Sequence, residues 1–450
     1  MLLSTEKKPL LVRINVVRRD ALALVLILLT SLCLSMSLPA KADFKTIVVP
    51  DDYPTLQDAI NSAKEGDTIF IRKGTYEEPL NHTLEINKTL SILGENTKNT
   101  IIKLYPAYNI TWILTQSFYE IANAATIVAN DVKLLNLTIV ANPAGNVSIT
   151  GDRTQLLGNN VTSKISIEGS YCNVTENILR DGLNLQGSSN KIARNHAGTI
   201  YLNSGETNVI CNNTCYSIDL SSSHKNIISG NKLETTSYGY DAISLSSSNN
   251  NVIYTNTVSG FNRGLSLFFS SGNLVIANTI TDADTAIKLG GSHNNTFYLN
   301  NFVDKKYWSD GYVEDDFTDP WFRYTYPNAT VSSNFWDNGS LGNHWDNYNG
   351  SDINHDGIGE TPYTIKIVVR YFEDSEEEVV CGEDNFPLMS RVDINSVNID
   401  LPQQSASPDP SQEPPPETDE SFTTILVLAT ASTLVIVAIA TLVYFKKRKH

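Results

Sequence analysis

The sequence predicts an all-β fold of the solenoid type, with an apolar segment near each end of the chain. Two observations predict the fold: one stretch recurs through the middle of the chain, and each copy alternates apolar and polar residues over short runs. One copy reads A-I-S-L-S-S-S-N-N-N-V-I-Y-T-N from Ala242 to Asn256, and another reads A-I-K-L-G-G-S-H-N-N-T-F-Y-L-N from Ala286 to Asn300. Such alternation, broken by Ser, Gly and Asn, is typical of β-strands that bury one face.

The copies recur at a short interval, which selects among repeat architectures. The asparagines that close them are Asn177, Asn195, Asn212, Asn231, Asn256, Asn278 and Asn300, so the steps are 18, 17, 19, 25, 22 and 22 residues. No copy can bury its own apolar face, so stacked copies would share an interior of Ile, Leu and Val. The recurring asparagine suits a stacked amide ladder and tolerates the left-handed backbone of tight turns. Helical repeats are excluded by the short strands, and propeller blades need ~40 residues or more.

The segment before the repeats predicts a helix that covers the open first coil. It reads I-V-V-P-D-D-Y-P-T-L-Q-D-A-I-N-S-A-K-E-G-D-T-I-F-I-R-K-G-T-Y from Ile47 to Tyr76. The apolar residues at helical spacing between Pro54 and Lys64 are Leu56, Ala59, Ile60 and Ala63. A helix with this apolar face would cover backbone groups that the first coil otherwise leaves unpaired.

After Asn301 the repeat stops and an aromatic, acidic module begins. It contains S-N-F-W-D-N-G-S-L-G-N-H-W-D-N-Y-N-G-S-D-I-N-H-D-G-I-G-E-T-P-Y, residues 333–363, and later D-N-F-P-L-M, residues 384–389. We expect 302–390 to close the C-terminal end of the stack, with Trp336, Trp345 and Tyr348 covering the last coil.

The repeats resemble the parallel β-helix repeats of the pectin lyase-like superfamily, and the module 302–390 resembles the C-terminal module of NosD-like β-helix proteins. The resemblance spans residues 47–389 and implies a right-handed parallel β-helix over 43–301. It implies no single activity, because this superfamily includes lyases, hydrolases, esterases and proteins that are not enzymes.

Both ends of the chain have the composition of targeting segments. Residues 1–42 join a basic stretch to an apolar run and to Ala40-Lys41-Ala42, as in a secretory signal peptide, with an uncleaved anchor as the alternative. Residues 422–445 are apolar and uncharged, which predicts a single transmembrane helix. The basic tail 446–450 would stay in the cytoplasm, so the bulk of the protein would face outward from the cell membrane. These basic residues disfavour a GPI signal, and the Pro- and Glu-rich residues 391–421 would form a stalk.

The net charge, the sequons and the cysteines limit which partners and which cellular compartment we expect for this protein. The formal net charge of −16 argues against nucleic acid, because phosphate attracts basic surfaces. The acceptor triplets for N-glycosylation indicate an exported glycoprotein, and we expect it in an archaeal envelope. The alternative is that an Asn- and Thr-rich chain forms such triplets by chance. Examples begin at Asn81, Asn136, Asn173, Asn294 and Asn338. An oxidising compartment permits disulfides, and three pairings are possible among Cys172, Cys211, Cys215 and Cys381.

Aligning the copies arranges their outward residues in columns. The middle residue of each I-x-L strand gives, in successive coils, Asn184, Tyr201, Asp219, Ser244, Ser266 and Lys288. Polar and aromatic groups along a rod could bind a sugar chain, so the candidate ligand-binding residues are Asn184, Tyr201, Asp219 and Lys288. An ordinary solvated strand face is the alternative.

The column just before that strand places Asp241 one coil from Arg263. These are the candidate catalytic residues, since a carboxylate beside a guanidinium stays ionised and could suit a calcium-assisted lyase that uses Arg as base. A surface ion pair is the alternative. Asp181 is three coils from Asp241, roughly 14 Å, whereas sugar-cleaving carboxyls lie ~5–10 Å apart. We therefore expect carbohydrate binding or an envelope-structural role, with a polysaccharide-cleaving lyase or hydrolase as the alternative.

The stretch D-I-N-H-D-G-I-G-E-T-P-Y, residues 352–363, resembles half of a calcium loop. Its candidate ligands are Asp352, Asn354, Asp356, the carbonyl of Ile358, and Glu360. The twelfth residue is Tyr363 where an EF-hand needs Glu, so a structural calcium site completed from elsewhere and an Asp/Asn/Gly turn are the open alternatives.

The NosD resemblance implies copper delivery, but copper sites group His, Cys and Met, and here the histidines are scattered along the sequence. We therefore do not expect copper.

Overall fold

The computed structural model describes residues 44–113, 116–235, 241–304, 312–370 and 376–397. The chain divides into two units, and all the elements named below lie in the second, which begins at Thr46. The predicted signal peptide (1–42), transmembrane helix (422–445), basic tail (446–450) and most of the stalk (391–421) lie outside the described residues. Within the described ranges, no helix is long and apolar enough to cross a membrane.

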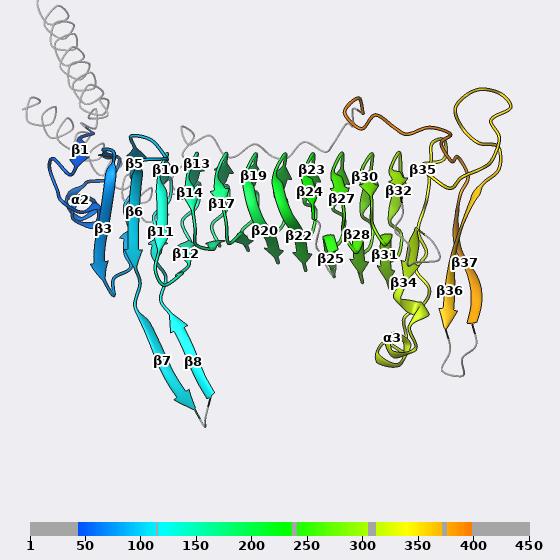
Figure 1. Cartoon of the computed structure of the whole chain (residues 1–450), viewed down its shortest axis with the longest axis horizontal. Helices are drawn as coiled ribbons and strands as arrows, with labels where there is room; N and C mark the ends of the chain where they lie inside the picture. The colour runs from blue at the N-terminus through cyan, green and yellow to red at the C-terminus, as the bar shows by residue number, and fades with distance from the viewer. Residues whose placement is uncertain (1–43, 114–115, 236–240, 305–311, 371–375, 398–450) are drawn as a thin grey trace, which may run out of the picture. The chain divides into compact units, whose positions relative to one another are not determined.

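The repeats form a right-handed parallel β-helix, which confirms the predicted fold class (Figure 1). Its strands fall into three rows, and each strand pairs with the equivalent strand of the next coil. Row 1 is a sheet of its own: β1 (Thr46–Val49), β2 (Thr68–Ile71), β5 (Ser91–Gly94), β10 (Lys133–Leu135), β13 (Gln155–Leu157), β16 (Asn173–Thr175), β19 (Lys191–Ala193), β21 (Val209–Cys211), β23 (Ile227–Ser229), β26 (Val252–Tyr254), β29 (Leu274–Ile276) and β32 (Thr296–Tyr298).

Rows 2 and 3 join into one large sheet, because two strands, β20 (His196–Asn203) and β22 (Thr214–Ser221), run through both rows. Row 2 also contains β3 (Gly74–Leu80), β6 (Thr100–Tyr105), β11 (Thr138–Ala141), β14 (Asn160–Val161), β17 (Ile178–Leu179), β24 (Lys232–Glu234), β27 (Thr257–Ser259), β30 (Thr279–Thr281), β33 (Asn301–Val303) and β35 (His344–Trp345). Row 3 also contains β4 (Leu84–Ile86), β9 (Ala125–Ile127), β12 (Val147–Ile149), β15 (Ile165–Ile167), β18 (Leu183–Leu185), β25 (Asp241–Ser246), β28 (Arg263–Phe268), β31 (Thr285–Gly290) and β34 (Val313–Asp315). Parallel pairing thus continues past Asn301 into the predicted cap module.

The interior of the stack is the predicted column of aliphatic side chains. In β25, Ile243 and Leu245 are buried while Ser244 between them is partly exposed, as the alternation requires. The helix α2 (Leu56–Ser62) covers the first coil and buries Leu56, Ala59 and Ile60, which confirms the predicted capping helix. Thr55 caps its N-terminus by accepting a hydrogen bond from the N–H of Asp58.

Buried asparagines form the predicted amide ladder, with one correction. From Asn177 onward, the Oδ1 of each accepts hydrogen bonds from the backbone N–H and from the Nδ2 of the ladder residue one coil earlier. The ladder consists of Asn159, Asn177, Asn195, Asn213, Asn231, Asn256, Asn278, Asn300 and Asn343. The prediction of Asn212 was wrong: Asn212 is exposed, with φ of 55°, and the buried residue is Asn213. A left-handed residue precedes each ladder asparagine from Asn159 to Asn300, as Arg194 and Thr255 also show with φ of 54° and 53°.

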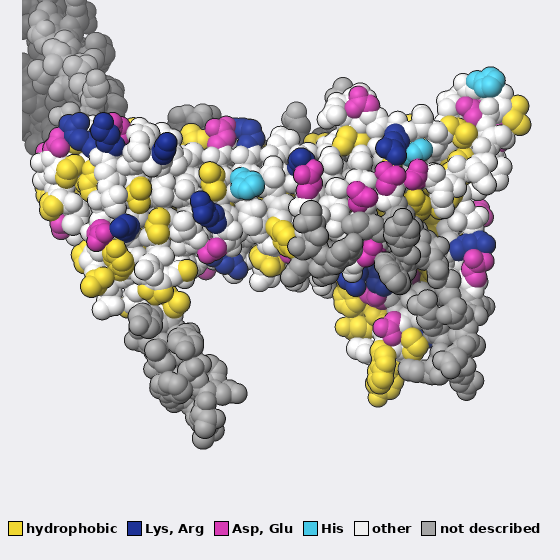
Figure 2. All heavy atoms as spheres, viewed as in Figure 1, with side chains coloured by type: hydrophobic (Ala, Val, Ile, Leu, Met, Phe, Trp, Pro, Cys, Tyr) yellow, Lys and Arg dark blue, Asp and Glu magenta, His cyan; other side chains and the backbone are white. Residues whose placement is uncertain are grey.

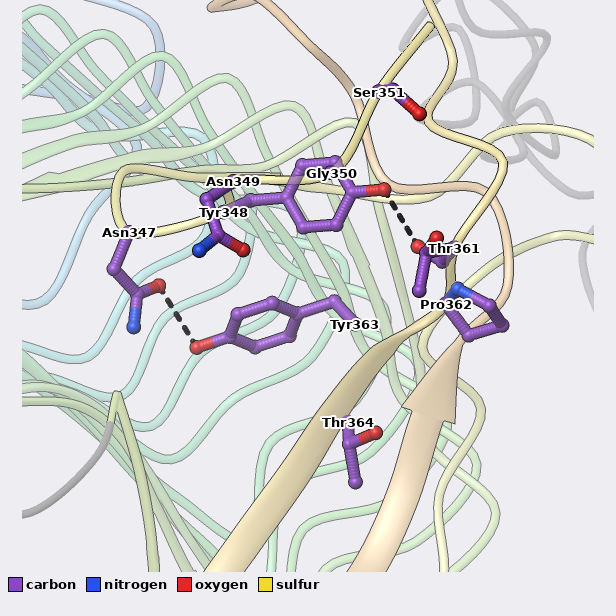
Figure 3. A pocket seen from close by; sticks show the side chains of 9 residues that line it. All are labelled: Asn347, Tyr348, Asn349, Gly350, Ser351, Thr361, Pro362, Tyr363 and Thr364. Atoms are coloured by element: carbon purple, nitrogen blue, oxygen red, sulfur yellow. Dashed lines mark hydrogen bonds between the residues drawn. The ribbon is translucent and has the colours of Figure 1, made fainter.

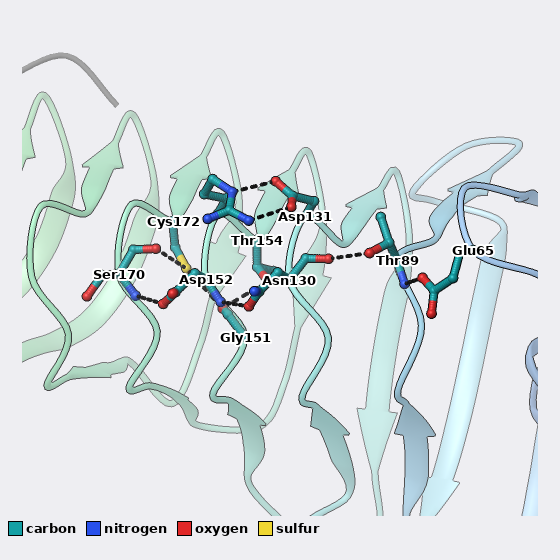
Figure 4. A network of polar contacts seen from close by, with 10 residues as sticks. Glu65, Thr89, Asn130, Asp131, Gly151, Asp152, Thr154, Ser170 and Cys172 are labelled. Carbon is teal, nitrogen blue, oxygen red and sulfur yellow. Dashed lines mark hydrogen bonds and ion pairs between the residues drawn. The ribbon is translucent and has the colours of Figure 1, made fainter. Parts of the chain in front are cut away.

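Side chains at another turn tie the N-terminal coils to one another (Figure 4). The N–H of Thr89 donates to Oε2 of Glu65 at 2.6 Å, and the hydroxyl of Thr89 donates to the carbonyl of Asn130 at 2.9 Å. The N–H of Asp152 donates to Oδ1 of Asn130, and the N–H of Ser170 donates to Oδ1 of Asp152, both at 2.8 Å. Each coil therefore positions the backbone of the next through a side chain.

Outside the rows lie two antiparallel hairpins, β7 (Tyr108–Ile113) with β8 (Gln116–Ile121) and β36 (Tyr363–Arg370) with β37 (Glu376–Asp384), and two short helices, η1 (Asp316–Thr318) and α3 (Pro320–Thr325). Two tryptophans close the last coil as predicted. Trp336 stacks on Phe297 with ring centroids 4.6 Å apart, and Trp345 packs on Phe302 at 4.5 Å. The third predicted residue, Tyr348, is partly buried against this core.

Candidate functional site

The outward residues of row 3 form one column, and strand register confirms its alignment. Cα partners run from Asn184 to Tyr201, to Asp219, to Ser244, to Ser266 and to Lys288. Each step is one coil, ~4.8 Å along the stack. The candidate ligand-binding residues therefore lie on one face, whereas their binding role stays a prediction.

Tyr201 is the exposed aromatic residue in the middle of this column. Its side chain is 43% exposed although the strand residues on either side are partly or fully buried. The ammonium of Lys164 lies 5.1 Å from the centroid of its ring, within the range of a cation–π contact. Asn184 and Asp219 flank Tyr201 in register, so an aromatic ring stands between an amide and a carboxyl group.

Asp219 has an unusual carboxyl group for a strand face. Its pKa is raised to about 6, chiefly by burial and in smaller part by the negative charge of Asp241, while a hydrogen bond from Ser217 lowers it. The Ser217 hydroxyl lies 3.2 Å from Oδ2 of Asp219 and 3.0 Å from the hydroxyl of Thr199. Near neutral pH this carboxyl group can therefore exist in both protonation states and can accept or donate a hydrogen bond.

The candidate catalytic residues form an ion pair. Asp241 and Arg263 are Cα partners on β25 and β28, and Nη1 of Arg263 lies 3.2 Å from Oδ1 of Asp241. Sequence reasoning compared Asp241 with Asp181 and missed its influence on Asp219. The two carboxyl groups come from different columns, and β22 pairs directly with β25, which a column-by-column alignment does not reveal.

Lys288, at the C-terminal end of the column, is engaged by the protein itself. Its ammonium lies 3.2 Å from Oε2 of Glu314 and 2.9 Å from Oδ1 of Asp316, and its side chain is only 17% exposed. These pairs tie β31 to β34 and η1. Elsewhere on the molecule, charged side chains of both signs are interspersed over the face shown in Figure 2.

The predicted calcium loop is closed by its own hydrogen bonds. Oδ1 and Oδ2 of Asp352 accept from the N–H groups of Asp356 and Gly357, at 3.1 and 2.9 Å. Oδ1 of Asp356 accepts from the N–H of Ile358 at 2.8 Å, and Oε1 of Glu360 accepts from the N–H of Ile353 at 2.7 Å and from that of Asn354. The three carboxylates thus cap backbone donors, which favours the Asp/Asn/Gly turn. Calcium binding stays a prediction.

A pocket of about 500 Å³ lies beside this loop in the cap (Figure 3). It was not predicted from the sequence. Two chain segments, 347–351 and 361–364, line it with Asn347, Tyr348, Asn349, Gly350, Ser351, Thr361, Pro362, Tyr363 and Thr364. The segments lie ten residues apart and meet only because the loop folds back, so sequence reasoning had no signal for the cavity.

A protein-family model described as "Periplasmic copper-binding protein (NosD)" matches residues 60–350, which is most of the β-helix and the start of the cap. The chain belongs to the NosD family. This match agrees with the resemblance found in the repeats and in the C-terminal module. No curated protein matches the sequence significantly.

Several solved structures are similar to this NosD-family chain. The A-module of a mannuronan C-5 epimerase from Azotobacter vinelandii is 13% identical with a TM-score of 0.45, covering 66% of this chain and 93% of that one. A PL6 alginate lyase solved with a trisaccharide is 11% identical with a TM-score of 0.41, covering 65% and 80%. The catalytic domain of a GH87 α-1,3-glucanase solved with nigerose is 15% identical with a TM-score of 0.42, covering 65% and 69%.

The described residues of this NosD-family chain do not fit a copper site. Across the described ranges, no three His, Cys, Asp or Glu side chains come together in a group that could hold a metal ion. Nδ1 of His82 is buried without a hydrogen-bond partner but belongs to no such group. The four cysteines within the described ranges are unpaired, and burial raises the pKa of Cys172 to about 11 and that of Cys215 to about 12. At neutral pH these two are therefore thiols, whereas soft metals bind thiolates.

Proposed function

We propose that this protein binds carbohydrate at the outer surface of a cell, through the column Asn184–Tyr201–Asp219 of row 3. The observation that carries the proposal is the exposed ring of Tyr201 between an amide and a carboxyl group on adjacent coils. A sugar ring has apolar C–H faces and a rim of hydroxyl groups. An aromatic side chain can pack against a C–H face, and neighbouring polar groups can form hydrogen bonds with the hydroxyl groups and fix the orientation of the ring.

Regular spacing supports an extended ligand rather than a single small molecule. Side chains on successive coils recur every ~4.8 Å on one face, so a chain lying along the stack contacts several coils. Ser244 continues the column beyond Asp219 with a small, partly exposed side chain, whereas Ser266, the next residue in register, is buried, so the accessible column runs from Asn184 to Ser244.

The proposed location at the cell surface rests on the predicted signal peptide, the predicted transmembrane helix and the sequons of the sequence. The positions of the asparagines agree with export. The sequon residues Asn81, Asn136, Asn173, Asn294 and Asn338 are all exposed, whereas the ladder asparagines are buried. A glycosyltransferase could therefore reach these five positions without unfolding a coil.

A glycan-array screen of the full chain in detergent, with and without calcium, tests this proposal. Tyr201→Ala is expected to weaken binding about tenfold or more, which is ~1.4 kcal/mol. Tyr254→Ala is the matched control, since Tyr254 lies on an outward position of β26 in row 1. Equal binding by the parent and by Tyr201→Ala, or binding to no glycan, would remove the column as the site.

A second candidate function, cleavage of a polysaccharide, is favoured by one observation. The pKa of Asp219 is raised, and the carboxyl group of Asp241, which pairs with Arg263, belongs to the adjacent coil, so two carboxyl groups of different surroundings lie on neighbouring strands, as acid–base catalysis on sugars commonly uses. Product analysis of the glycans that bind distinguishes the candidates. Shortened products that disappear in Asp241→Asn would establish catalysis, and unchanged glycans would support binding alone.

A further inference from the structure

We propose that the pocket in the cap is a second, separate binding site that takes one uncharged sugar unit. The pocket lies between residues 347–351 and 361–364, and none of the predicted functional residues lines it. The proposal does not depend on the column of row 3, because the two sites share no residue.

The pocket is preformed by the folding of one loop. The N–H of Glu360 donates to the carbonyl of Ser351 at 3.0 Å and closes the base of that loop. Tyr348 donates its hydroxyl to the carbonyl of Thr361 at 2.6 Å, and Tyr363 donates its hydroxyl to Oδ1 of Asn347 at 3.0 Å. Both bonds link one lining segment to the other, as Figure 3 shows. A ligand would therefore meet walls that already have their bound shape.

The two tyrosine side chains of the pocket are held in place by residues that do not all line it. The ring of Tyr363 stacks on the buried Trp345, with centroids 4.4 Å apart and planes 11° from parallel. The hydroxyl of Tyr348 lies against two glycines, because a Cβ added at Gly350 or at Gly359 would stand 2.0 Å from it. Any side chain at these two positions would displace Tyr348. The local sequence thus preserves the position of one ring hydroxyl.

The lining chemistry selects an uncharged, hydroxyl-rich ligand. All nine lining residues are uncharged: amides, hydroxyls, two tyrosines, a proline and a glycine. Burial raises the pKa of Tyr348 and that of Tyr363, so both hydroxyls remain protonated at neutral pH. Acidic residues flank the lining segments in the sequence, at Asp346, Asp352 and Glu360, so an anionic ligand would meet repulsion.

Hydrogen-bonding capacity remains open inside this lining. Oδ1 of Asn347 is taken by the Tyr363 hydroxyl, which leaves the two Nδ2 donors of Asn347 without a partner among the described residues. The exposed amide of Asn349 offers a further donor and acceptor. An amide that can both donate and accept matches a sugar hydroxyl, and a volume of about 500 Å³ falls within the ~300–1,000 Å³ of small-molecule pockets.

The test is a titration of the full chain in detergent with neutral mono- and disaccharides and with the matching uronates. Asn349 belongs to an N-x-S triplet, so the protein is made in a host without N-glycosylation. Tyr363 stacks on Trp345, so tryptophan fluorescence gives a readout together with calorimetry. We expect a neutral sugar to bind at least tenfold more tightly than its uronate.

Asn349→Ala is the decisive variant, because Asn349 is exposed and its side chain holds no other part of the described fold. Asn349→Ala should lower the affinity for the neutral sugar at least fivefold, and Gly350→Ala should abolish binding by displacing Tyr348. Asn328→Ala, at an exposed asparagine outside the pocket, should change nothing. Binding that survives Asn349→Ala unchanged, a preference for the uronate, or no binding by any sugar of the panel would overturn the proposal.

The same titration separates this proposal from the proposed function. Tyr201→Ala should leave the pocket's affinity for the neutral sugar unchanged while it removes glycan binding by the column. Loss of the pocket signal in Tyr201→Ala would assign that signal to the column and would overturn the pocket proposal alone.

Discussion

The middle of the coil stack and its C-terminal end satisfy buried polar groups in different ways. In the middle, each ladder asparagine accepts from the coil before it and donates to the coil after it, so one residue type serves every coil. At the end no further coil follows. There the backbone N–H of Asn343 donates to Oδ2 of Asp384 at 2.7 Å, and a carboxylate replaces the next amide.

A second column shows the same ending. The hydroxyls of Ser223, Ser248, Ser270, Ser292 and Ser332 each accept from the backbone N–H of the residue one coil earlier. The N–H of Ser332 then donates to Oδ2 of the buried Asp315 at 2.8 Å. Two independent ladders thus end in an aspartate. A carboxylate offers acceptors alone, which suits the end of a chain of donors, although a further ladder of asparagines, from Asn190 to Asn334, ends in an amide.

The largest effect is expected inside the asparagine ladder. Asn213→Ala would leave the N–H and Nδ2 of Asn195 without their acceptor in a buried site and should cost ~3–5 kcal/mol of unfolding free energy. Asn212→Gly is the control, since glycine adopts the positive φ of this exposed neighbour freely. Chemical denaturation of both variants measures the contrast. Equal losses would contradict the assignment of Asn213 to the ladder.

A somewhat smaller loss is expected at the end of the ladder. Asp384→Ala would remove the acceptor for the N–H of Asn343 and for Nε1 of Trp345, which lies 2.8 Å from Oδ2. We expect ~2–4 kcal/mol. Asp384→Asn keeps the shape and one acceptor oxygen, so it should cost less. If Ala and Asn cost the same, the carboxylate does not act as the terminal acceptor.

The end of the asparagine ladder should also depend on pH, because its terminal acceptor, Asp384, is a buried acid. Burial raises the pKa of Asp384 to about 6, against the hydrogen bonds from Trp345 and Asn343 that lower it. A folded-state pKa above the unfolded value of 3.8 means that protonation favours the folded state. This contribution is complete below pH 3.8 and is lost as the pH rises through about 6.

Unfolding free energy measured from pH 4 to pH 7 checks this prediction. The parent should lose stability over that interval relative to Asp384→Asn, which has no group to titrate there. Asp219 contributes with the same sign in both proteins, so the difference between them isolates Asp384. Parallel profiles would show that Asp384 does not titrate in this range.

The smallest effect is expected on the solvated face of row 3. Arg263→Gln breaks the ion pair with Asp241, but the side chain of Arg263 is well exposed, so the change should be ~0–1 kcal/mol. Thermal unfolding at low and at high salt measures it. A loss as large as that of Asn213→Ala would mean that this pair supports the fold as the ladder does.

The repeated part of the fold could be predicted because each copy repeats the same alternation of apolar and polar residues. In Ile243, Ser244 and Leu245, this alternation alone predicts which side chains face the interior and which face outward. The ladder was missed by one residue at Asn212-Asn213, since two adjacent asparagines satisfy the same pattern and only the backbone φ distinguishes them. The serine ladder was missed because Ser is also common in exposed turns.

The candidate sites were predictable only in part. The column of Asn184, Tyr201 and Asp219 follows from the repeat, since equivalent residues of successive copies must align. The effect of Asp241 on Asp219 and the cap pocket both join residues from different alignment positions. Such contacts depend on how coils and loops pack, and a single sequence does not contain that information.

The one-way direction of the asparagine ladder has a consequence for how such a protein can change over generations. Removing or duplicating a whole internal copy leaves every amide with a donor on one side and an acceptor on the other. The first coil and the terminal carboxylates are untouched by such an event. The number of coils can therefore change by whole copies. The C-terminal module has to be kept, because it supplies Asp384, the acceptor at which the asparagine ladder ends.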